Sequence, residues 1–283
     1  MILITGSTGF VGRYLVKEIS KKYSLSCIVR KKNQEPTKNT KLFYADLLDK
    51  FALEKAFSDV KTVIHVAALT EGKPETIKKT NVEGTKNLIE LSKKYNIQKF
   101  IFISSDSVNL KKPGPYAQSK IDSERIVKES GLDYIILRPN WIYDDKGEKD
   151  LKQIISLVKK FPIVPIIGNG NYKLQPVHIK DVVYAIKKVI KSNQIHNKIY
   201  SLGGSEEITF NEIVDEVSKN LNLKRKKLHI SVTLINLLSP ITRISKGRIK
   251  EIIQSKISDN SQAIKDLEYN PVSIKDVLIK IVR

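Results

Sequence analysis

The first twelve residues, Met1-Ile2-Leu3-Ile4-Thr5-Gly6-Ser7-Thr8-Gly9-Phe10-Val11-Gly12, decide the fold. The apolar run before Gly6 is typical of a short buried strand, and apolar residues at helical spacing follow over residues 11–22. Gly6 permits the tight turn, Gly9 lets the backbone approach a diphosphate, and Gly12 lets the helix pack against the strand. The N–H groups and positive dipole end of the helix attract that anion. We therefore predict a dinucleotide site, with contacts at Gly6, Thr8, Gly9, Phe10, Val11 and Gly12.

Length and composition narrow the class of protein. The 283 residues can form one large domain or two small ones, and a hydrophobic content of 41% is enough for a core. No apolar run is long enough for a membrane span, and the chain begins directly with the expected strand, so we expect neither a span nor a signal peptide. The single Cys27 cannot form an internal disulfide, which favours a cytoplasmic location. The histidines are scattered, so no metal site is predicted.

The formal net charge is +20, from 50 lysines and arginines against 30 acids. Only eight of these cations are arginines, whose planar fork is the usual reader of phosphates and bases. The lysines are spread among glutamates, as on solvated helix faces, so we expect no specific nucleic-acid binding. The densest block, residues 224–227, is expected to lie in a loop.

Strand-like and helix-like segments alternate in the first half, which predicts an α/β fold with a doubly wound parallel Rossmann sheet. The expected strands are residues 2–5, 26–30, 42–45, 62–66, 99–104 and 134–138, and the expected helices are 11–22, 52–57, 75–95 and 116–130. The later chain predicts helices over 151–161 and 179–191, an amphipathic helix from Phe210 to Leu221, a strand over 198–202, and loop or edge structure over 162–170. We expect a dinucleotide-binding domain, residues 1–150, and a smaller C-terminal substrate-side lobe, residues 151–283, with segments that return to the first domain.

A second group of residues, Ser105, Tyr116 and Lys120, has the side chains that acid–base catalysis requires. Tyr116 and Lys120 share one face of a predicted helix, and Ser105 follows a strand-like run, at the edge where parallel sheets bind ligands. A free tyrosine has a pKa of ~10, and lowering it toward 7 takes ~4 kcal/mol. One cation at ~4 Å, with an effective dielectric of ~20, contributes about that much. The Tyr116–Lys120 spacing can therefore supply a base for hydride-transfer chemistry.

With these features the chain resembles the short-chain dehydrogenase/reductase superfamily, and within it the extended and atypical members. The other motifs are Asp46-Leu47, Val63-Ile64-His65-Val66-Ala67-Ala68, Asn81-Val82-Glu83-Gly84-Thr85, Leu137-Arg138-Pro139 and Pro176-Val177-His178-Ile179-Lys180-Asp181. The resemblance implies that Tyr116 is the catalytic acid and base, and that Lys120 lowers its pKa and binds the cofactor ribose. It also implies that Ser105 hydrogen-bonds the substrate carbonyl. Asn81 would support a proton path, with helix capping as the alternative. The cofactor contacts it implies beyond the first turn are Arg30, Asp46, Leu47, Ala67, Ala68, Lys120 and Pro139.

The end of the second strand indicates which dinucleotide binds. Sites that prefer NAD commonly place an acid there for the ribose 2′-hydroxyl, whereas a nearby arginine accommodates a 2′-phosphate. Here Val29 takes the acidic position and Arg30 follows it. We therefore expect NADP, with NAD as the alternative and with a surface role as the alternative for Arg30.

Two classes of function remain. The first is an NAD(P)-dependent oxidoreductase or epimerase acting on a small-molecule carbonyl or hydroxyl, such as a sugar or nucleotide-sugar derivative. The chain departs from two patterns of the family. Dehydratases carry Thr-Asp-Glu where this chain has Ser105-Asp106-Ser107, and epimerases usually carry Asn and Arg where this chain has Trp141 and Leu174. The second is a non-catalytic NADPH-binding structural or sensing subunit, because the chain also resembles the group of the complex I accessory subunit. The resemblance further implies a homodimer, and His178 is expected to be a packing residue.

Overall fold

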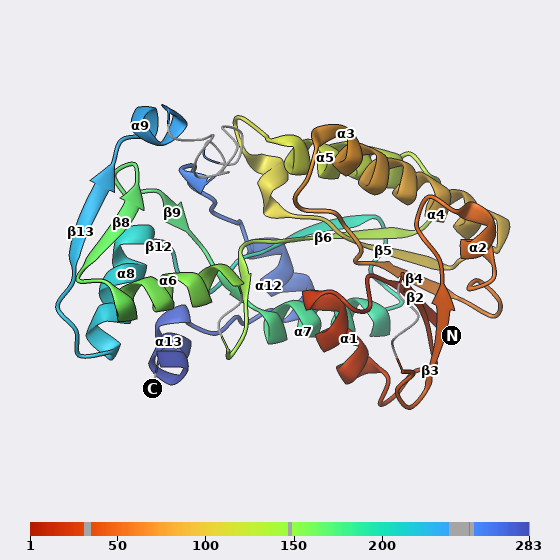
Figure 1. Ribbon diagram of the computed structural model, residues 1–283. Helices are drawn as coiled ribbons and strands as arrows, with labels where there is room; N and C mark the ends of the chain where they lie inside the picture. Colours follow the sequence, from red (N-terminus) through yellow and green to blue (C-terminus); the bar gives the residue numbers. More distant parts are fainter. Residues whose placement is uncertain (31–34, 147–148, 238–248, 250–251, 283) are drawn as a thin grey trace. The chain divides into compact units, whose positions relative to one another are not determined.

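The computed structural model describes residues 1–30, 35–146, 149–237, 249 and 252–282 (Figure 1). The chain forms two compact units whose segments alternate along the sequence. The first comprises Met1–Val108, Pro115–Arg138 and Val183–Tyr200, and the second Asn109–Gly114, Pro139–Val182 and Ser201–Arg283. The division into domains of residues 1–150 and 151–283 stays a prediction.

The first unit is built on a seven-stranded sheet with the order β11-β6-β5-β4-β1-β2-β3. Its strands are β1 Ile2–Thr5, β2 Leu25–Val29, β3 Thr40–Tyr44, β4 Thr62–His65, β5 Lys99–Ile103, β6 Tyr134–Pro139 and β11 Lys198–Leu202. Neighbouring strands from β6 to β3 pair in parallel. This topology confirms the predicted doubly wound α/β fold. It also puts the turn after β1 at the carboxyl edge, in the middle of the sheet, where such sheets bind ligands.

Helices cover both faces of this sheet, with α4 and α5 on one face and α1 and α7 on the other (Figure 1). The connecting helices are α1 Phe10–Ile19, α2 Lys50–Glu54, α3 Pro74–Lys78, α4 Gly84–Lys94, α5 Pro115–Lys128 and α7 Ile179–Lys191. The single helix expected over residues 75–95 is instead divided, because a π-helical turn, η1 Lys79–Glu83, joins α3 to α4. Such insertions often occur at functional positions, and this one carries Asn81.

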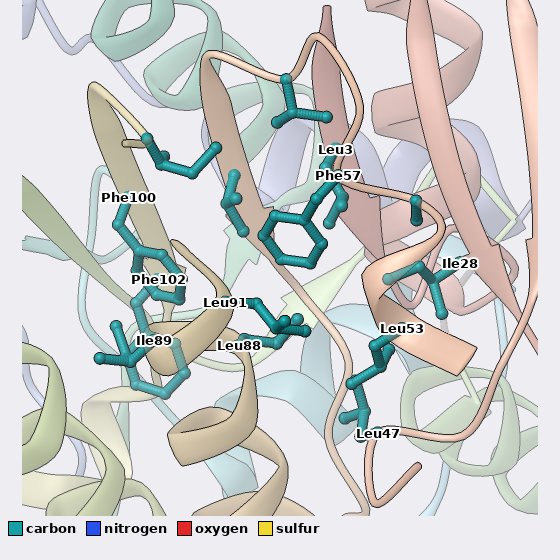
Figure 2. Packing of buried hydrophobic residues seen from close by; sticks show 14 of the residues in the cluster. Leu3, Ile28, Leu47, Leu53, Phe57, Leu88, Ile89, Leu91, Phe100 and Phe102 are labelled. Carbon is teal, nitrogen blue, oxygen red and sulfur yellow. The ribbon is translucent and has the colours of Figure 1, made fainter. Parts of the chain in front are cut away.

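The core of the first unit explains why its central strands are apolar on both sides. Leu3, Phe100 and Phe102 project from the sheet toward Leu88 and Leu91 of α4 (Figure 2). All five side chains are fully buried. Strands covered on both faces carry continuous apolar runs rather than alternating ones, which is the pattern that the sequence shows.

The second unit has short strand pairs packed against helices. Its strands are β7 Ile142–Tyr143, β8 Ile163–Ile167, β9 Lys173–Leu174, β10 Val177–His178, β12 Ile208–Thr209 and β13 Lys226–Ile230. Its helices are α6 Lys149–Lys160, α8 Phe210–Asn220, α9 Val232–Leu237, α12 Ser261–Leu267 and α13 Ile274–Val282, and a 3₁₀ turn, η2 Asp106–Asn109, ends in this unit. The helix predicted from Phe210 is confirmed as α8, and the structure shows in addition a capping box of Thr209 and Glu212 at its start.

One sequence-based expectation is wrong in this unit. Residues 224–227 were expected to form a loop, but Lys226 and Lys227 begin β13, which pairs in parallel with β8. The pairing with Ile163 and Val164 outweighs the like charges of the block. In the described part of the chain no helix is long and apolar enough to cross a membrane.

Candidate functional site

The turn after β1 is so tight that two of its glycines cannot carry a side chain. Gly6 has φ +68°, and a Cβ there would lie 2.7 Å from backbone atoms of Ala67. A Cβ on Gly12 would lie 2.0 Å from the carbonyl oxygen of Gly6. At Gly9, which is exposed, the nearest atom would be the same oxygen at 3.3 Å. Gly6 and Gly12 therefore fix the turn, whereas Gly9 leaves its backbone open to a ligand.

The N-terminus of α1 follows directly. Gly9 is the N-cap, with extended backbone and no side chain that caps the first turn. Thr8 is exposed, and Phe10 and Val11 are half-buried. Because the first N–H groups of a helix have no partner within it, this end offers donors to a diphosphate.

A cavity of about 520 Å³ lies beside the turn. Among the described residues its lining includes the cations Arg13, Lys17 and Lys38 and one acid, Glu35. The guanidinium of Arg13 lies over the ring of Phe10, 5.0 Å from its centroid. The other described residues that line the cavity are Ser7, Thr8, Val16, Ser20, Cys27, Thr37, Thr40 and Leu42.

The lining of the cavity takes in Cys27 of β2 and the described residues that follow this strand from Glu35 to Leu42. Arg30 is exposed just beyond β2, whereas Val29 is buried inside it. Among the described residues, the strand therefore ends on Val29 and Arg30, and the first acid after it is Glu35.

Other residues predicted to contact the cofactor lie after β3 and β4. The Oδ1 atom of Asp46 accepts a hydrogen bond of 2.9 Å from the N–H of Leu48, which makes Asp46 a turn residue as well as a candidate contact. Leu47 is buried, and a Cβ on Gly84 would lie 2.8 Å from its Cβ. Ala67 donates its N–H to Thr5 Oγ1 at 3.2 Å, which brings the Ala67–Ala68 segment against the glycine turn.

Lys120 is the most unusual side chain of the site because its charge is completely buried. Its Nζ donates to the carbonyl oxygen of Ile103 at 2.7 Å and lies 4.5 Å from the ring centroid of Phe102. Burial lowers the pKa of Lys120 to about 7, and the carboxylate of Glu124 partly opposes that shift. A buried lysine with a strongly lowered pKa is a candidate functional residue.

Ser105 and Tyr116 approach the same edge of the sheet. Ser105 follows β5, and its Oγ accepts hydrogen bonds from the N–H of Ser107, at 3.2 Å, and from Ser107 Oγ, at 2.9 Å. Tyr116 is half-buried in the first turn of α5, one helical turn before Lys120. The structure thus places three of the four predicted catalytic residues in the first unit, with Ser105 just after β5 and with Tyr116 and Lys120 on α5.

Asn81 supports this arrangement from η1. Its side chain exchanges two hydrogen bonds with the backbone of Leu69, and its Nδ2 donates to Ser119 Oγ at 2.9 Å. Ser119 in turn donates to the carbonyl oxygen of Tyr116 at 2.7 Å. Asn81 therefore ties the loop after β4 to the turn of α5 that carries the tyrosine, rather than capping a helix.

Sequence reasoning missed an ion pair beneath the lysine. Glu124 is buried and accepts two hydrogen bonds from Arg138, at 2.9 and 2.6 Å, and one from Ser104 Oγ at 2.6 Å. The spacing of four residues indicates that Lys120 and Glu124 are neighbours on one helix, but no local signal pairs Glu124 with Arg138. Because Arg138 is on β6, these hydrogen bonds fasten α5 to the carboxyl end of that strand.

A second missed group is His65, which is fully enclosed at the end of β4. Its ring nitrogens lie 2.7 Å from Thr5 Oγ1 and 3.1 Å from Thr85 Oγ1. Burial, and secondarily the charge of Lys120, holds the pKa of His65 well below its ordinary value. A neutral histidine therefore joins β1, β4 and α4 beneath the glycine turn.

The remaining candidate residues are in the second unit and make mainly packing contacts. His178 is buried edge-on to Tyr143, with ring centroids 5.2 Å apart, and its Nε2 lies 3.3 Å from Asp145. Leu174 is buried in the core of this unit, and Trp141 is half-buried beside it. Pro139 ends β6.

Comparison with known proteins gives consistent results. A sequence profile described as the NAD dependent epimerase/dehydratase family matches residues 2–203. A putative UDP-glucose 4-epimerase of Methanocaldococcus jannaschii is 30% identical, over 81% of this chain and 85% of its own. A mitochondrial NADH dehydrogenase (ubiquinone) 1 alpha subcomplex subunit 9 of Dictyostelium discoideum is 24% identical, over 99% of this chain and 83% of its own.

A solved structure shares the fold. The UDP-glucuronic acid 4-epimerase of Bacillus cereus, in complex with UDP-glucuronic acid and NAD, has a TM-score of 0.81 at 22% identity. The match covers 99% of this chain and 97% of the epimerase.

Proposed function

Because the chain belongs to the NAD-dependent epimerase/dehydratase family, we propose that it is an enzyme of hydride transfer at a carbonyl or hydroxyl carbon. The substrate we propose is a small sugar or nucleotide-sugar derivative. In support, relatives of the chain are named as epimerases of nucleotide sugars.

The observation that carries this proposal is the buried Lys120, with its Nζ fixed on Ile103 and its helix shared with Tyr116. In the proposed reaction the Tyr116 hydroxyl gives a proton to the developing alkoxide or removes one from the alcohol. Ser105 Oγ orients the reacting oxygen, and Lys120 stabilises the tyrosinate when it forms. A nicotinamide held at this site would supply or accept the hydride. Asn81 holds Tyr116 in place through Ser119.

The glycine turn fits such a cofactor. Its exposed Gly9 backbone and the start of α1 would take the diphosphate. Lys120 of α5 contacts Ile103, the last residue of β5, at the carboxyl end of the same sheet. We propose NADP as the preferred form, because Arg13, Lys17 and Lys38 line the adjacent cavity and Arg30 stands at the end of β2. Glu35 in the same lining is the feature that favours NAD.

A second function is favoured by one relative, which is named as a subunit of NADH dehydrogenase. In that alternative the chain binds the dinucleotide as a structural or sensing subunit without turnover. With the enzymatic function we also propose a homodimer, on the basis of the family resemblance. We propose a cytoplasmic location because the buried Cys27 cannot form an internal disulfide.

Turnover separates the two functions. The purified chain would be incubated with NADP or NAD and a panel of nucleotide sugars and simple carbonyl compounds, while nicotinamide absorbance and sugar configuration are followed. Conversion of any substrate supports the enzyme. Tight dinucleotide binding by calorimetry, with no conversion across the panel, supports the non-catalytic subunit.

A further inference from the structure

The two-stranded sheet of β8 and β13 in the second unit has one apolar face that solvent reaches. The register places Ile163 beside Lys226, Pro165 beside Leu228 and Ile167 beside Ile230. Side chains at alternate positions of a strand point to the same face, so these six residues share one face of the sheet.

The opposite face is turned toward the core of this unit and α8, although His229 on that face is itself exposed. Val164 and Ile166 of β8 are buried in the core of this unit. On β13, Lys227 forms an ion pair of 2.7 Å with Asp215, and His229 lies 3.0 Å from Asn211, both residues of α8. The residues between them consequently point outward. Ile163 is 50% exposed and Leu228 is 54% exposed.

Further exposed apolar side chains lie next to these strands along the chain. Phe161 precedes β8 and is 50% exposed, and in α9, which follows β13, Leu234 is 47% and Leu237 is 76% exposed (Figure 1). Ile235 faces inward. We call Phe161, Ile163, Pro165, Leu228, Leu234 and Leu237 the apolar strip. Exposed apolar side chains that gather in one region of the surface usually mark an interaction site.

Lysines gather at the amino ends of the two strands. Arg225 donates its Nε to the carbonyl oxygen of Val158 at 2.6 Å, which holds the end of α6 beside the start of β13. This contact brings together four exposed lysines at one end of the apolar strip, which are Lys159, Lys160, Lys224 and Lys226.

We propose that the apolar strip and these lysines form a docking surface for an anionic lipid membrane. An apolar surface that enters the interface, with cations beside it at the headgroups, is the pattern of peripheral membrane contacts, and lysine stems can extend along apolar surface. A second copy of this chain fits less well because each copy carries a net charge of +20 and the lysines of both would meet. A nucleic acid would leave the apolar strip in water. The contact is a surface one, independent of the proposed catalysis.

The test uses the full chain and vesicles of phosphatidylcholine, with and without 30% phosphatidylglycerol, in a sedimentation assay. We expect binding to the anionic vesicles that weakens as salt is raised. The double variant Ile163→Ser, Leu228→Ser should weaken it by roughly tenfold, because two apolar side chains no longer enter the interface. The triple variant Lys160→Gln, Lys224→Gln, Lys226→Gln should lose about fivefold for each lysine.

Matched controls remove the same groups from the first unit. Phe51, 77% exposed on α2, is changed to Ser, and the exposed Lys73, Lys78 and Lys93 are changed together to Gln. Circular dichroism establishes that each variant folds, and if the double variant does not, Leu237→Ser replaces it. Retained binding by the controls supports the docking surface. The proposal is overturned if the control variants lose as much vesicle binding as the strip variants, or if the unmodified chain does not bind anionic vesicles at low salt. A change of molar mass by light scattering in the strip variants without vesicle binding also overturns it, since the strip would then join two copies.

Discussion

Arg138 holds Glu124 with two hydrogen bonds, from Nε at 2.9 Å and from Nη2 at 2.6 Å, one helical turn beyond Lys120. Arg138 is on β6 and Glu124 on α5, so the pair fastens the helix of the candidate site to its sheet. The carboxylate has a second effect, since its charge helps Lys120 to stay protonated in a fully buried position.

Replacing Glu124 by Gln should therefore destabilise the first unit. Breaking one partner of a buried ion pair leaves the other charge uncompensated, and the expected loss in unfolding free energy is about 3 kcal/mol. Denaturant unfolding of the variant and of the exposed control Glu129→Gln measures the loss. Equal stability of both variants would show that the pair carries no such energy.

Lys120 should make stability depend on pH. Its pKa is lowered to about 7 in the folded chain by burial, whereas the ordinary value is 10.5. Between these pH values the unfolded chain binds more protons, so the destabilisation by Lys120 is complete below pH 7 and is relieved as the pH rises toward 10.5.

The Lys120→Met variant isolates that contribution. Subtracting its unfolding free energy from that of the unmodified chain should leave a term that rises by about 1 kcal/mol per pH unit above neutrality. A flat difference would mean that Lys120 keeps its proton in the fold.

The glycine turn should tolerate a methyl group at one position and not at another. Gly12→Ala puts a Cβ 2.0 Å from the carbonyl oxygen of Gly6, so both thermal stability and dinucleotide binding should fall. Gly9→Ala meets the same oxygen only at 3.3 Å and should stay folded, while the larger Gly9→Val should block the diphosphate. Thermal unfolding and NADPH titration of the three variants check this. Unchanged NADPH affinity in folded Gly9→Val would contradict the assignment.

Arg30 should select NADP. If its guanidinium binds the 2′-phosphate, Arg30→Ala should cost about 1.5–3 kcal/mol of NADPH binding and leave NADH binding nearly unchanged. Arg125, an exposed arginine of α5, gives the control Arg125→Ala. Calorimetry in which the unmodified chain binds NADH as tightly as NADPH would contradict the preference.

Local sequence signals were sufficient where one segment decides its own structure. The bounds of α7 and β11 coincide with the predicted ranges, since each has a complete periodic pattern. The π-turn around Asn81 was not predictable, because it depends on contacts with Leu69 and Ser119 from other elements. The start of β13 at Lys226 was missed for the same reason, as its partner strand comes from a distant part of the chain.

The candidate site divides in the same way. Ser105, Tyr116 and Lys120 could be placed from strand and helix positions alone. The roles of Glu124, Arg138 and His65 depend on packing in three dimensions, and the sequence gives only weak signals for it. Only the structure shows how far these polar side chains are removed from solvent, and buried polar groups need hydrogen-bond partners.

The most direct test of the account is the turnover of Tyr116→Phe beside that of Tyr44→Phe, an exposed tyrosine of β3 in the same unit. Removal of the Tyr116 hydroxyl should leave the fold and NADPH affinity intact and lower the rate constant of the chemical step by roughly 10²–10⁴, the usual contribution of a general acid or base. The Tyr44 variant should keep the full rate. Turnover by Tyr116→Phe at the rate of the unmodified chain would contradict the proposed chemistry.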